Sequence, residues 1–537
     1  MSRPAENASS ILVSAMSGTT NLIFVQLASR LFIFASNQLI LRSLSPSVLG
    51  IAAQLELFLI SILYFSRESI RAAIQRQPLQ SPVSSAATGK EKDAVSTRDE
   101  QERGKIQTIS SQSIVNMSYL SIGMGIITAT VFAVCYLRFA SNEVLETPHY
   151  HASVVIIAVA SLIELSSEPV FAVVQQYMLY GRRATVEVSA AFLKSLVTCG
   201  ISTWAVRYGH SLGALSFALG HLTYALAIFC GYFIFAFRQP SDWHFSLLLS
   251  RIASNDGSKY FGDRFSARLL VLSANVFFQS VVKYLLTQGD SMILAAMTSL
   301  KDQGIYSLAS NYGGLLARIL FQPVEESSRT IFSSLLSTKR SKKQQANITL
   351  AKAHLLSVMR VYMVIAVLII PLGPSLAPKA LHILGGRRWT APDVDALLAL
   401  YCYYIPFLAF NGIGEAFVSS TASPQELRKQ AVWMGLFSAC FALASYLFLS
   451  VGRLGAQGLV YANIVNMCVR IIWSFAFIRR YLQEHKSNVS FRDFSLRPQT
   501  YAAGAVAAVL LSEAGSSIRP HGDLTLFTIG GGYVLQV

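Results

Sequence analysis

The chain of 537 residues is 53% hydrophobic and only 13% charged, whereas a soluble domain has about 25% charged residues. Apolar runs of about 20 residues recur along nearly the whole length, and a helix of that length crosses a hydrocarbon core of about 30 Å. These features exclude a soluble globular protein. The runs do not alternate apolar and polar residues as barrel strands do, so we expect transmembrane helices.

The formal net charge of +16 would suit a nucleic-acid-binding protein, but its distribution argues against one. Most Lys and Arg residues lie in short loops between apolar runs, which is the positive-inside pattern. If the N-terminus is cytosolic, cytosolic segments carry about three times as many of these residues as the opposite side. We therefore expect cytosolic N- and C-termini and no nucleic-acid partner.

The apolar runs predict an all-α membrane protein with about 14 transmembrane helices. We expect two pseudo-symmetric six-helix lobes, two additional C-terminal helices and a central cavity. The expected spans are 19–41, 48–70, 112–137, 152–176, 186–206, 212–237, 272–297, 304–331, 354–375, 393–419, 430–451, 456–479, 499–516 and 522–537.

Two long loops help to define the expected domains. Residues 75–111 are rich in Ser, Gln, Lys and Glu, a composition typical of disorder. Asp242–Arg268 contains Trp243 and Phe245, so we expect part of it to form an interfacial amphipathic helix. The resulting domains are an N-terminal lobe (1–241), a cytosolic linker (242–271), a C-terminal lobe (272–480) and a helix pair (481–537).

A weak internal repeat supports two related halves. Gly50-Ile51 and Gly304-Ile305 occupy corresponding places at the first-to-second and seventh-to-eighth span junctions. Each pair precedes an apolar helix that ends in a cluster of charged residues. Chance similarity between Leu- and Ser-rich segments is the alternative. Duplicated halves are typical of transporters whose substrate site lies between the repeats.

Charged side chains inside the expected spans need an explanation, because each costs several kcal/mol in a bilayer. One explanation is internal pairing or snorkelling to the membrane surface. The other is a cationic path: Arg30 and Arg42 lie about 18 Å apart in height on one helix, and Arg318 and Arg470 lie in other spans. The arginine fork binds phosphate oxygens well, so the sequence favours an anionic, phosphate-bearing substrate.

The acidic segment Glu164-Leu-Ser-Ser-Glu168-Pro169 admits two interpretations. Residues four apart face the same way on a helix, and the proline permits a kink. The segment is therefore either a hinge beside a polar cavity or a pairing site for a neighbouring cation.

Enzyme signatures are not recognised: the sequence has no Walker loop, HExxH or GxSxG. Asp393-Val-Asp395 resembles a metal-binding DxD, but two acids at a helix N-terminus are the favoured interpretation. All six cysteines lie within apolar runs, which favours buried thiols over metal ligands or disulfides. We expect no catalytic residues, metal or cofactor.

We also expect none of the sequons, at Asn7, Asn116, Asn347 and Asn488, to be glycosylated, because none faces the lumen in this topology.

Several motifs together resemble the Rft family of oligosaccharide translocation proteins, in family order from the first span to the twelfth. The most specific is Ala317-Arg318-Ile-Leu-Phe-Gln-Pro323-Val-Glu325-Glu326-Ser. The others are Ala28-Ser-Arg30, Asn37-Gln-Leu-Ile-Leu-Arg42, Phe65-Ser-Arg67-Glu68, Glu164-Leu-Ser-Ser-Glu168-Pro169, Leu286-Thr-Gln-Gly-Asp290, Asn411-Gly-Ile-Gly-Glu415 and Asn463-Ile-Val-Asn466-Met-Cys-Val-Arg470. Asp290 stands where the family pattern leads us to expect a glutamate.

The resemblance implies a flippase-type fold of the multidrug/oligosaccharidyl-lipid/polysaccharide superfamily in the endoplasmic reticulum membrane. The implied substrate is dolichyl-pyrophosphate-linked Man5GlcNAc2, which passes from the cytosolic to the lumenal leaflet for N-linked glycosylation. On this hypothesis the substrate-binding residues are Arg30, Arg42, Arg67, Arg318, Arg470, Asp290 and Glu325. The two acids are expected to pair with the arginines when the site is empty. Membrane lipids are the other partners, and we expect a monomer.

Other functions remain open at this stage. The protein could bind or deliver the lipid while another component moves it. A cation-coupled exporter of small molecules is a further alternative, although acids in excess of cations would suit it better than the arginines do.

Overall fold

The computed structural model describes most of the chain, and the expected spans 19–41 and 522–537 lie almost wholly outside the described residues. Those residues are 38, 40–42, 44–75, 97–177, 179–238, 246–252, 260–336, 344–386, 389–490 and 493–517. Within them, eight helices are long and apolar enough to cross a membrane, and two bent helix pairs bring the number to as many as ten. The chain is therefore a helical multi-pass membrane protein in which backbone polar groups are satisfied within each span.

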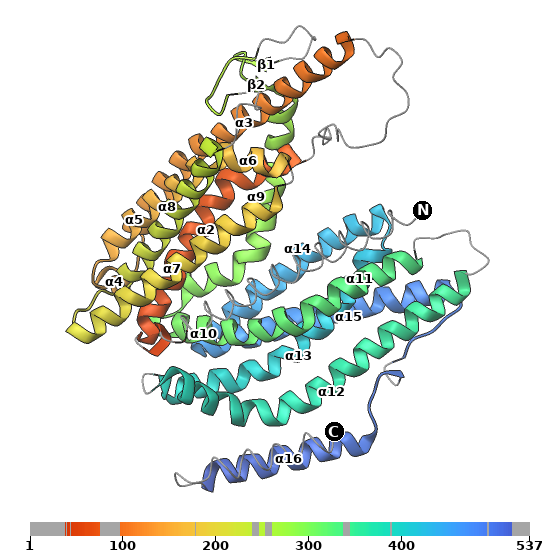
Figure 1. Cartoon of the computed structure of the whole chain (residues 1–537). Coiled ribbons are helices and arrows are strands. Elements are labelled where there is room, and N and C mark those ends of the chain that lie inside the picture. Colours follow the sequence, from red (N-terminus) through yellow and green to blue (C-terminus); the bar gives the residue numbers. More distant parts are fainter. Residues whose placement is uncertain are drawn as a thin grey trace, which may run out of the picture. The chain divides into compact units, whose positions relative to one another are not determined.

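The fold divides into two compact units (Figure 1). The N-terminal unit comprises Met1–Leu44 and Gln54–Gln288. In it α7 packs on α8, α8 on α5, and α3 on both α5 and α6. Its elements are α2 (Pro46–Gln75), α3 (Thr97–Arg138), α4 (Asn142–Leu145), α5 (Tyr150–Ser166), α6 (Glu168–Gln176), α7 (Tyr180–Tyr208), α8 (Leu215–Arg238), β1 (Tyr260–Phe261), β2 (Phe265–Ser266) and most of α9 (Ala267–Met297).

The C-terminal unit comprises Ser45–Ala53 and Gly289–Val537. Helix α13 lies at its centre and packs against α10, α11, α12 and α15, while α16 lies along α12 (Figure 1). The elements are α10 (Leu300–Leu316), the π-helix η1 (Ala317–Phe321), α11 (Gln322–Leu336), α12 (Gln344–Gly385), α13 (Pro392–Thr421), α14 (Pro424–Tyr446), the π-helix η3 (Leu447–Val451), α15 (Gly455–Glu484) and α16 (Pro498–Ser517). The expected span 304–331 thus combines α10, η1 and most of α11.

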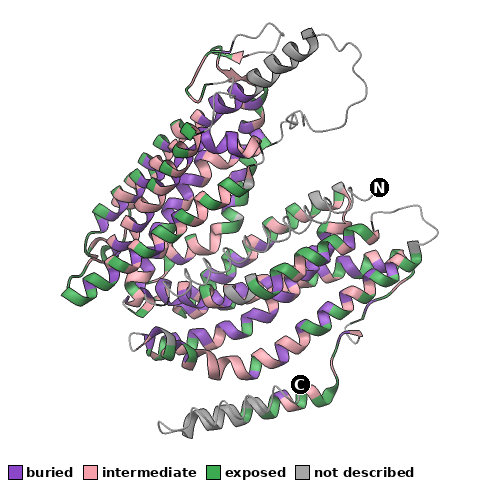
Figure 2. Ribbon diagram, in the orientation of Figure 1, coloured by how far each residue is buried: buried purple, intermediate pink, exposed green. Residues whose placement is uncertain are grey.

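Several polar side chains are buried and many large apolar ones are exposed, as is usual for a protein in a bilayer (Figure 2). Polar side chains such as Ser66 and Asn116 are fully buried, whereas Ile127 and Val131 on α3 are more than half exposed. In water such an apolar surface would promote association. In a membrane it faces lipid, and the polar side chains find partners inside the helix bundle.

Helix α9 does not separate the lobes as the sequence suggested. We expected the C-terminal lobe to begin with this helix, but it remains with the N-terminal unit as far as Gln288. The reason is packing, because Leu269 lies in a buried apolar cluster with Ile70. Further along α9, the hydroxyl of Tyr284 shares a hydrogen bond with Ser61 of α2.

The first long loop is shorter than the predicted disordered segment 75–111. Helix α3 begins at Thr97 and continues through this region to Arg138. Residues 97–107 are rich in Glu, Gln, Arg and Lys and contain no proline, so their helix propensity is high. Residues 76–96 lie outside the described part of the chain.

The interlobe linker is described only in part. Residues 246–252 and 260–266 contain an extended segment and a short antiparallel hairpin, β1–β2, whereas Trp243 and Phe245, on which the predicted amphipathic helix depends, lie outside the described residues. Asn116 of α3 holds both parts: its amide donates to the carbonyls of Ser250 (2.7 Å) and Arg264 (2.8 Å) and accepts from the backbone N–H of Ser250. These bonds satisfy linker backbone groups that a helix would otherwise satisfy internally. The sequon residue Asn116 is thus an internal structural residue.

The repeated glycines Gly50 and Gly304 meet in the C-terminal unit. A Cβ on Gly50 would lie far inside contact distance of the carbonyl oxygen of Leu300, and one on Gly304 would do the same at Pro46. Both obstacles are backbone atoms, which cannot rotate away as a side chain can. The start of α2 and the start of α10 therefore cross at a distance that only glycine permits.

Gly304→Ala should destabilise the protein by about 1–3 kcal/mol, because α2 and α10 must move apart to admit the methyl group. The measurement is the thermal unfolding midpoint of the purified full-length protein in detergent. Gly435→Ala on α14 is the matched control, since nothing lies within 4 Å of its added Cβ. The control midpoint should stay constant or rise, because alanine favours a helix over glycine. An unchanged midpoint for Gly304→Ala would contradict the proposed close crossing.

Candidate functional site

Four charged side chains form a cluster inside the N-terminal unit, which we call the N-terminal cluster: Arg67 and Arg71 of α2, Glu164 of α5 and Glu168 of α6. Arg67 Nη1 donates to Glu164 Oε1 at 2.6 Å and to Glu168 Oε1 at 3.4 Å. Arg71 donates through Nε (2.9 Å) and Nη2 (2.5 Å) to the two oxygens of Glu168. The second arrangement is the bidentate geometry that suits a guanidinium and a carboxylate.

The acidic motif brings the two carboxylates together at a helix break. Helices α5 and α6 are separated at Ser167 and bent by 41°. Pro169 stands in the first turn of α6 and forces no loss of an internal hydrogen bond there. The motif is therefore a pairing site for two arginines and lies at a bend, whereas a hinge beside a polar cavity stays a prediction.

The N-terminal cluster leaves its cations more accessible than its anions. The side chains of Glu164 and Glu168 are 8% and 3% exposed, whereas that of Arg67 is 22% exposed. Arg71 also lies over the Phe171 ring, 3.7 Å from its centroid, where a cation–π interaction adds to the ion pair. An anion that approached Arg67 would meet a guanidinium already held in place from behind by carboxylates.

More polar groups surround the N-terminal cluster. Lys194 of α7 lies close enough to Glu164 and Glu56 for their charges to interact. The buried side chain of His221 of α8 in turn interacts electrostatically with Lys194. The sequence analysis did not select Arg71 or His221 as site residues. Arg71 could have been found, because it follows Arg67 by four residues and therefore shares its helix face.

A second group of polar residues, the C-terminal cluster, lies in the other unit around Glu415 of α13. Glu415 accepts from Arg470 of α15 at 3.3 Å and from Asn411 at 3.4 Å. Glu325 of α11 lies close enough for its charge to interact with that of Glu415. Its carboxylate occupies the space where a side chain on Gly412 would lie. The glycine of the Asn-Gly-Ile-Gly-Glu motif thus admits an acid against the backbone of α13.

Two tyrosines extend the C-terminal cluster toward Asp290. The charge of Asp290 acts on Tyr306 and Tyr404, and Tyr404 is also within the field of Arg470. Asn463 donates to the Tyr306 hydroxyl at 3.0 Å. Asp290 itself accepts a hydrogen bond from the backbone N–H of Ser291 at 2.8 Å. Predicted residues Asp290, Glu325 and Arg470 therefore belong to one polar region of the C-terminal unit.

Three predicted residues are not assigned to either cluster. Arg30 lies outside the described residues, and Arg42 is exposed near the start of the described chain. Arg318 lies on the π-helix η1, and its side chain is not among those described. The acids that pair with Arg67 and Arg470 are Glu164, Glu168 and Glu415, rather than the expected Asp290 and Glu325.

The carboxylates of the DxD-like motif have separate partners. Asp393 accepts from Lys301 Nζ at 2.7 Å, and Asp395 bonds with His382 Nε2 at 2.8 Å. The hydrogen bond to Asp393 raises the pKa of Lys301 above its ordinary value. These pairs tie the start of α13 to α10 and α12, which is a structural role.

The sequence is similar to a known protein family over most of its length. The family model described as "Rft protein" matches residues 14–528. A Man(5)GlcNAc(2)-PP-dolichol translocation protein of Yarrowia lipolytica is 34% identical, over 97% of this chain and 78% of its own. Proteins with the same name from Candida glabrata (32%; 93% and 90% covered) and Saccharomyces cerevisiae (31%; 90% and 85% covered) are also similar.

Two solved structures share the fold at low sequence identity. An inward-facing multidrug resistance MATE transporter of the MOP superfamily aligns with a TM-score of 0.58 and 12% identity, over 85% of this chain and 95% of its own. The lipid II flippase MurJ in an inward closed conformation aligns with a TM-score of 0.55 and 12% identity, over 95% and 96%. The fold is therefore that of these transporters, and the match of the family model over almost the entire sequence shows that the chain belongs to the Rft protein family.

Proposed function

We propose that this protein moves dolichyl-pyrophosphate-linked Man5GlcNAc2, or assists its movement, from the cytosolic to the lumenal leaflet of the endoplasmic reticulum membrane for N-glycosylation. The observation that carries the proposal is similarity over nearly the whole chain to translocation proteins named for this lipid. The transporter-like fold supports it. We also propose the complete arrangement of 14 helices in two lobes, and a monomer.

The arginines would handle the pyrophosphate. Arg67 and Arg470 are each about one-fifth exposed and are held by carboxylates on other helices. This arrangement fixes the guanidinium without neutralising every donor, because arginine has five N–H groups. A pyrophosphate would compete with the carboxylates and accept hydrogen bonds from the free donors. Arg30, Arg42 and Arg318 would extend the path, and Asp290 and Glu325 would contribute to its polar lining.

The proposed movement requires no covalent step, catalytic residue or cofactor. Transport by alternating access would need only that the two units change their relative positions around the lipid headgroup. The helices α2 and α9 each contribute to both units, so any such change must pass through them. The carboxylates would restore the arginines to their resting positions after the pyrophosphate leaves.

Ion pairing argues against a cation-coupled exporter. Glu164, Glu168 and Glu415 already have guanidinium partners within the protein. A coupling cation would have to displace a permanently charged arginine from any of these three carboxylates. An accessory protein that binds the lipid without moving it remains the competing proposal, and transport measurements separate the two.

The direct test uses purified full-length protein in phosphatidylcholine vesicles loaded with Man5GlcNAc2-PP-dolichol. An impermeant mannosidase reports the fraction of lipid in the outer leaflet over time. We expect the protein to accelerate exchange between leaflets. Arg67→Ala and Arg470→Ala should each slow it about 10- to 100-fold, because a charge-assisted hydrogen bond contributes about 1.5–3 kcal/mol.

Arg207→Ala provides the control for the arginine variants. Arg207 lies in the last turn of α7, is exposed and belongs to neither cluster. Its rate should equal that of the unaltered protein. Binding of the lipid without protein-dependent exchange would support the accessory role and contradict transport.

The proposed orientation is tested separately, in sealed microsomes. Tags on the N- and C-termini should be removed by added protease without detergent, because we propose that both termini are cytosolic. The native sequons should remain unmodified, so endoglycosidase treatment should leave the mobility of the protein unchanged. Protection of either tag, or a glycosidase-sensitive shift, would show that the proposed orientation is wrong.

A further inference from the structure

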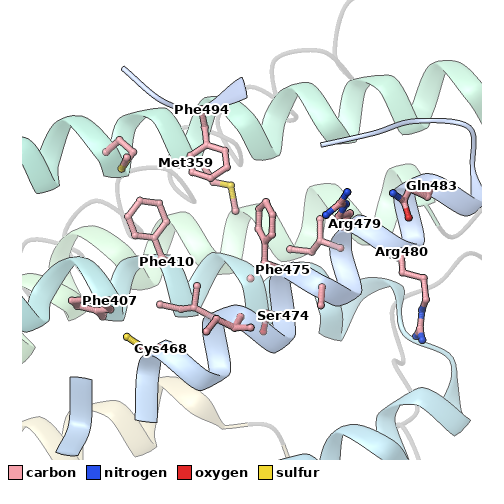
Figure 3. Close-up of a pocket in the computed structure, with 16 residues that line it drawn as sticks. Met359, Phe407, Phe410, Cys468, Ser474, Phe475, Arg479, Arg480, Gln483 and Phe494 are labelled. Carbon is pink, nitrogen blue, oxygen red and sulfur yellow. The ribbon is translucent and has the colours of Figure 1, made fainter. Parts of the chain in front are cut away.

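An apolar cavity lies within the C-terminal unit (Figure 3), and no residue of the C-terminal cluster is among those that line it. Its volume is about 750 Å³, within the range of about 300–1,000 Å³ that is usual for small-molecule sites. The lining comes from α12, α13, α15 and the connector after α15. Most of it is aromatic, aliphatic or sulfur-containing, including Met359, Phe407, Phe410, Phe475 and Phe494.

One face of α15 forms a wall of the cavity and changes character along its length. Cys468, Ile472, Phe475, Arg479 and Gln483 all line it. Their spacings of four, three, four and four residues place them on one helix face. The face is apolar for the first three residues and polar for the last two. It extends for about 22 Å at 1.5 Å per residue, so the cavity has an apolar length and one cationic end.

The opposite wall is held in place by hydrogen bonds from side chains of α12 to backbone carbonyls of the connector. Phe494 belongs to the connector between α15 and α16 and is 3% exposed. Its neighbour Asp493 accepts two hydrogen bonds at its carbonyl oxygen from Arg360 of α12, at 3.0 and 2.7 Å. Lys352 of α12 similarly donates to the carbonyl of Asn488 at 2.5 Å. Two cations thus fix the connector, so the wall that Phe494 supplies is already formed.

The two arginines at the cavity's end differ in their surroundings. Arg480 also lines the cavity, but it forms an ion pair with Glu426 of α14 at 3.5 Å. Arg479 lies on the cavity face with Gln483 (Figure 3), and the described residues provide it with no hydrogen bond or ion pair. A cation beside an apolar groove complements an amphiphile with an anionic head and a hydrocarbon tail.

We propose that this cavity binds the isoprenoid tail of a polyprenyl phosphate, with the phosphate beside Arg479 and Gln483. The inference rests on the proposed function, which supplies an anionic polyprenyl lipid as the substrate, and it assigns a place to the substrate's tail. In the proposed orientation α15 ends on the cytosolic side, so Arg479 lies at the leaflet from which the lipid starts. The cavity would hold the tail, with the phosphate at Arg479, before the arginines of the two clusters engage the pyrophosphate.

The test uses full-length protein in phosphatidylcholine vesicles and a radiolabelled polyprenyl phosphate that carries a photoreactive diazirine in its tail. After illumination, we expect labelled peptides from α13 and α15 that contain Phe410 and Phe475. Ile472→Trp, which fills the groove, should reduce this labelling at least tenfold. Ala476→Trp is a second filling variant, and elution as a single species in size exclusion checks the fold of both.

The cationic end of the cavity is tested by measuring the probe concentration that gives half-maximal labelling in each variant. Arg479→Ala should raise this concentration at least tenfold, and Arg479→Lys should raise it less, because the charge remains. Arg207→Ala, in the other unit, should leave it unchanged. Equal values for Arg479→Ala and the unaltered protein would overturn the assignment of the phosphate.

Competition identifies the class of lipid. Unlabelled polyprenyl phosphate should abolish labelling, whereas phosphatidate, which has a similar headgroup but two acyl chains, should not. Equal competition by phosphatidate, or labelling only outside α12, α13, α15 and the connector, would overturn the proposal. Leaflet exchange is measured in the same vesicles. Normal exchange in a filling variant that has lost labelling would refute the tail site alone, whereas absence of exchange with the unaltered protein would refute the proposed function.

Discussion

The pairing of Arg67 and Arg71 with Glu164 and Glu168 makes the interior of the N-terminal unit possible. A single buried charge among apolar helices is destabilising, and removing one partner of a buried pair typically costs about 3–5 kcal/mol. Here both cations come from one helix and both anions from the two sides of a helix break, so the bend between α5 and α6 is tied to α2. The cost of burying charge is offset by mutual neutralisation, and the result is a guanidinium held rigidly yet partly exposed. That combination is what recognition of a pyrophosphate requires.

In the C-terminal unit, different residues offset the cost of burying charged side chains. Arg470 faces Glu415, and Gly412 leaves space for Glu325 beside them. The two units therefore carry comparable arginine–glutamate pairs on unrelated local motifs. They are linked through α2 and α9, each of which belongs partly to both units. The close crossing of Gly50 and Gly304 fixes the beginning of α2 within the C-terminal unit, which leaves the later turns of this helix, with Arg67, to the other unit.

Much of this architecture could be predicted from the sequence, and the failures have physical causes. Apolar runs located the eight to ten spans of the described residues, because the bilayer imposes length and hydrophobicity on each helix. The pairing residues Glu164 and Glu168 were recognised, but their partners were not, since single-sequence patterns contain no information about which helices adjoin. The hairpin β1–β2 in the linker after α8 was not predicted. The buried amide of Asn116, which bonds to the linker backbone at Ser250 and Arg264, acts from a distant segment. The apolar cavity was equally invisible, because its walls come from three helices and a connector.

A double-mutant cycle on Arg67 and Glu164 tests most directly whether carboxylates hold the arginines in place. The measurement is the apparent unfolding midpoint of full-length protein carrying Arg67→Leu, Glu164→Leu or both. Each single change leaves a charge with fewer partners, so we expect two large losses of stability and a double variant much closer to the unaltered protein than their sum. An interaction energy of at least about 1 kcal/mol would be in the range for groups in direct contact. Losses that simply add would contradict the account, because the two side chains would then contribute independently.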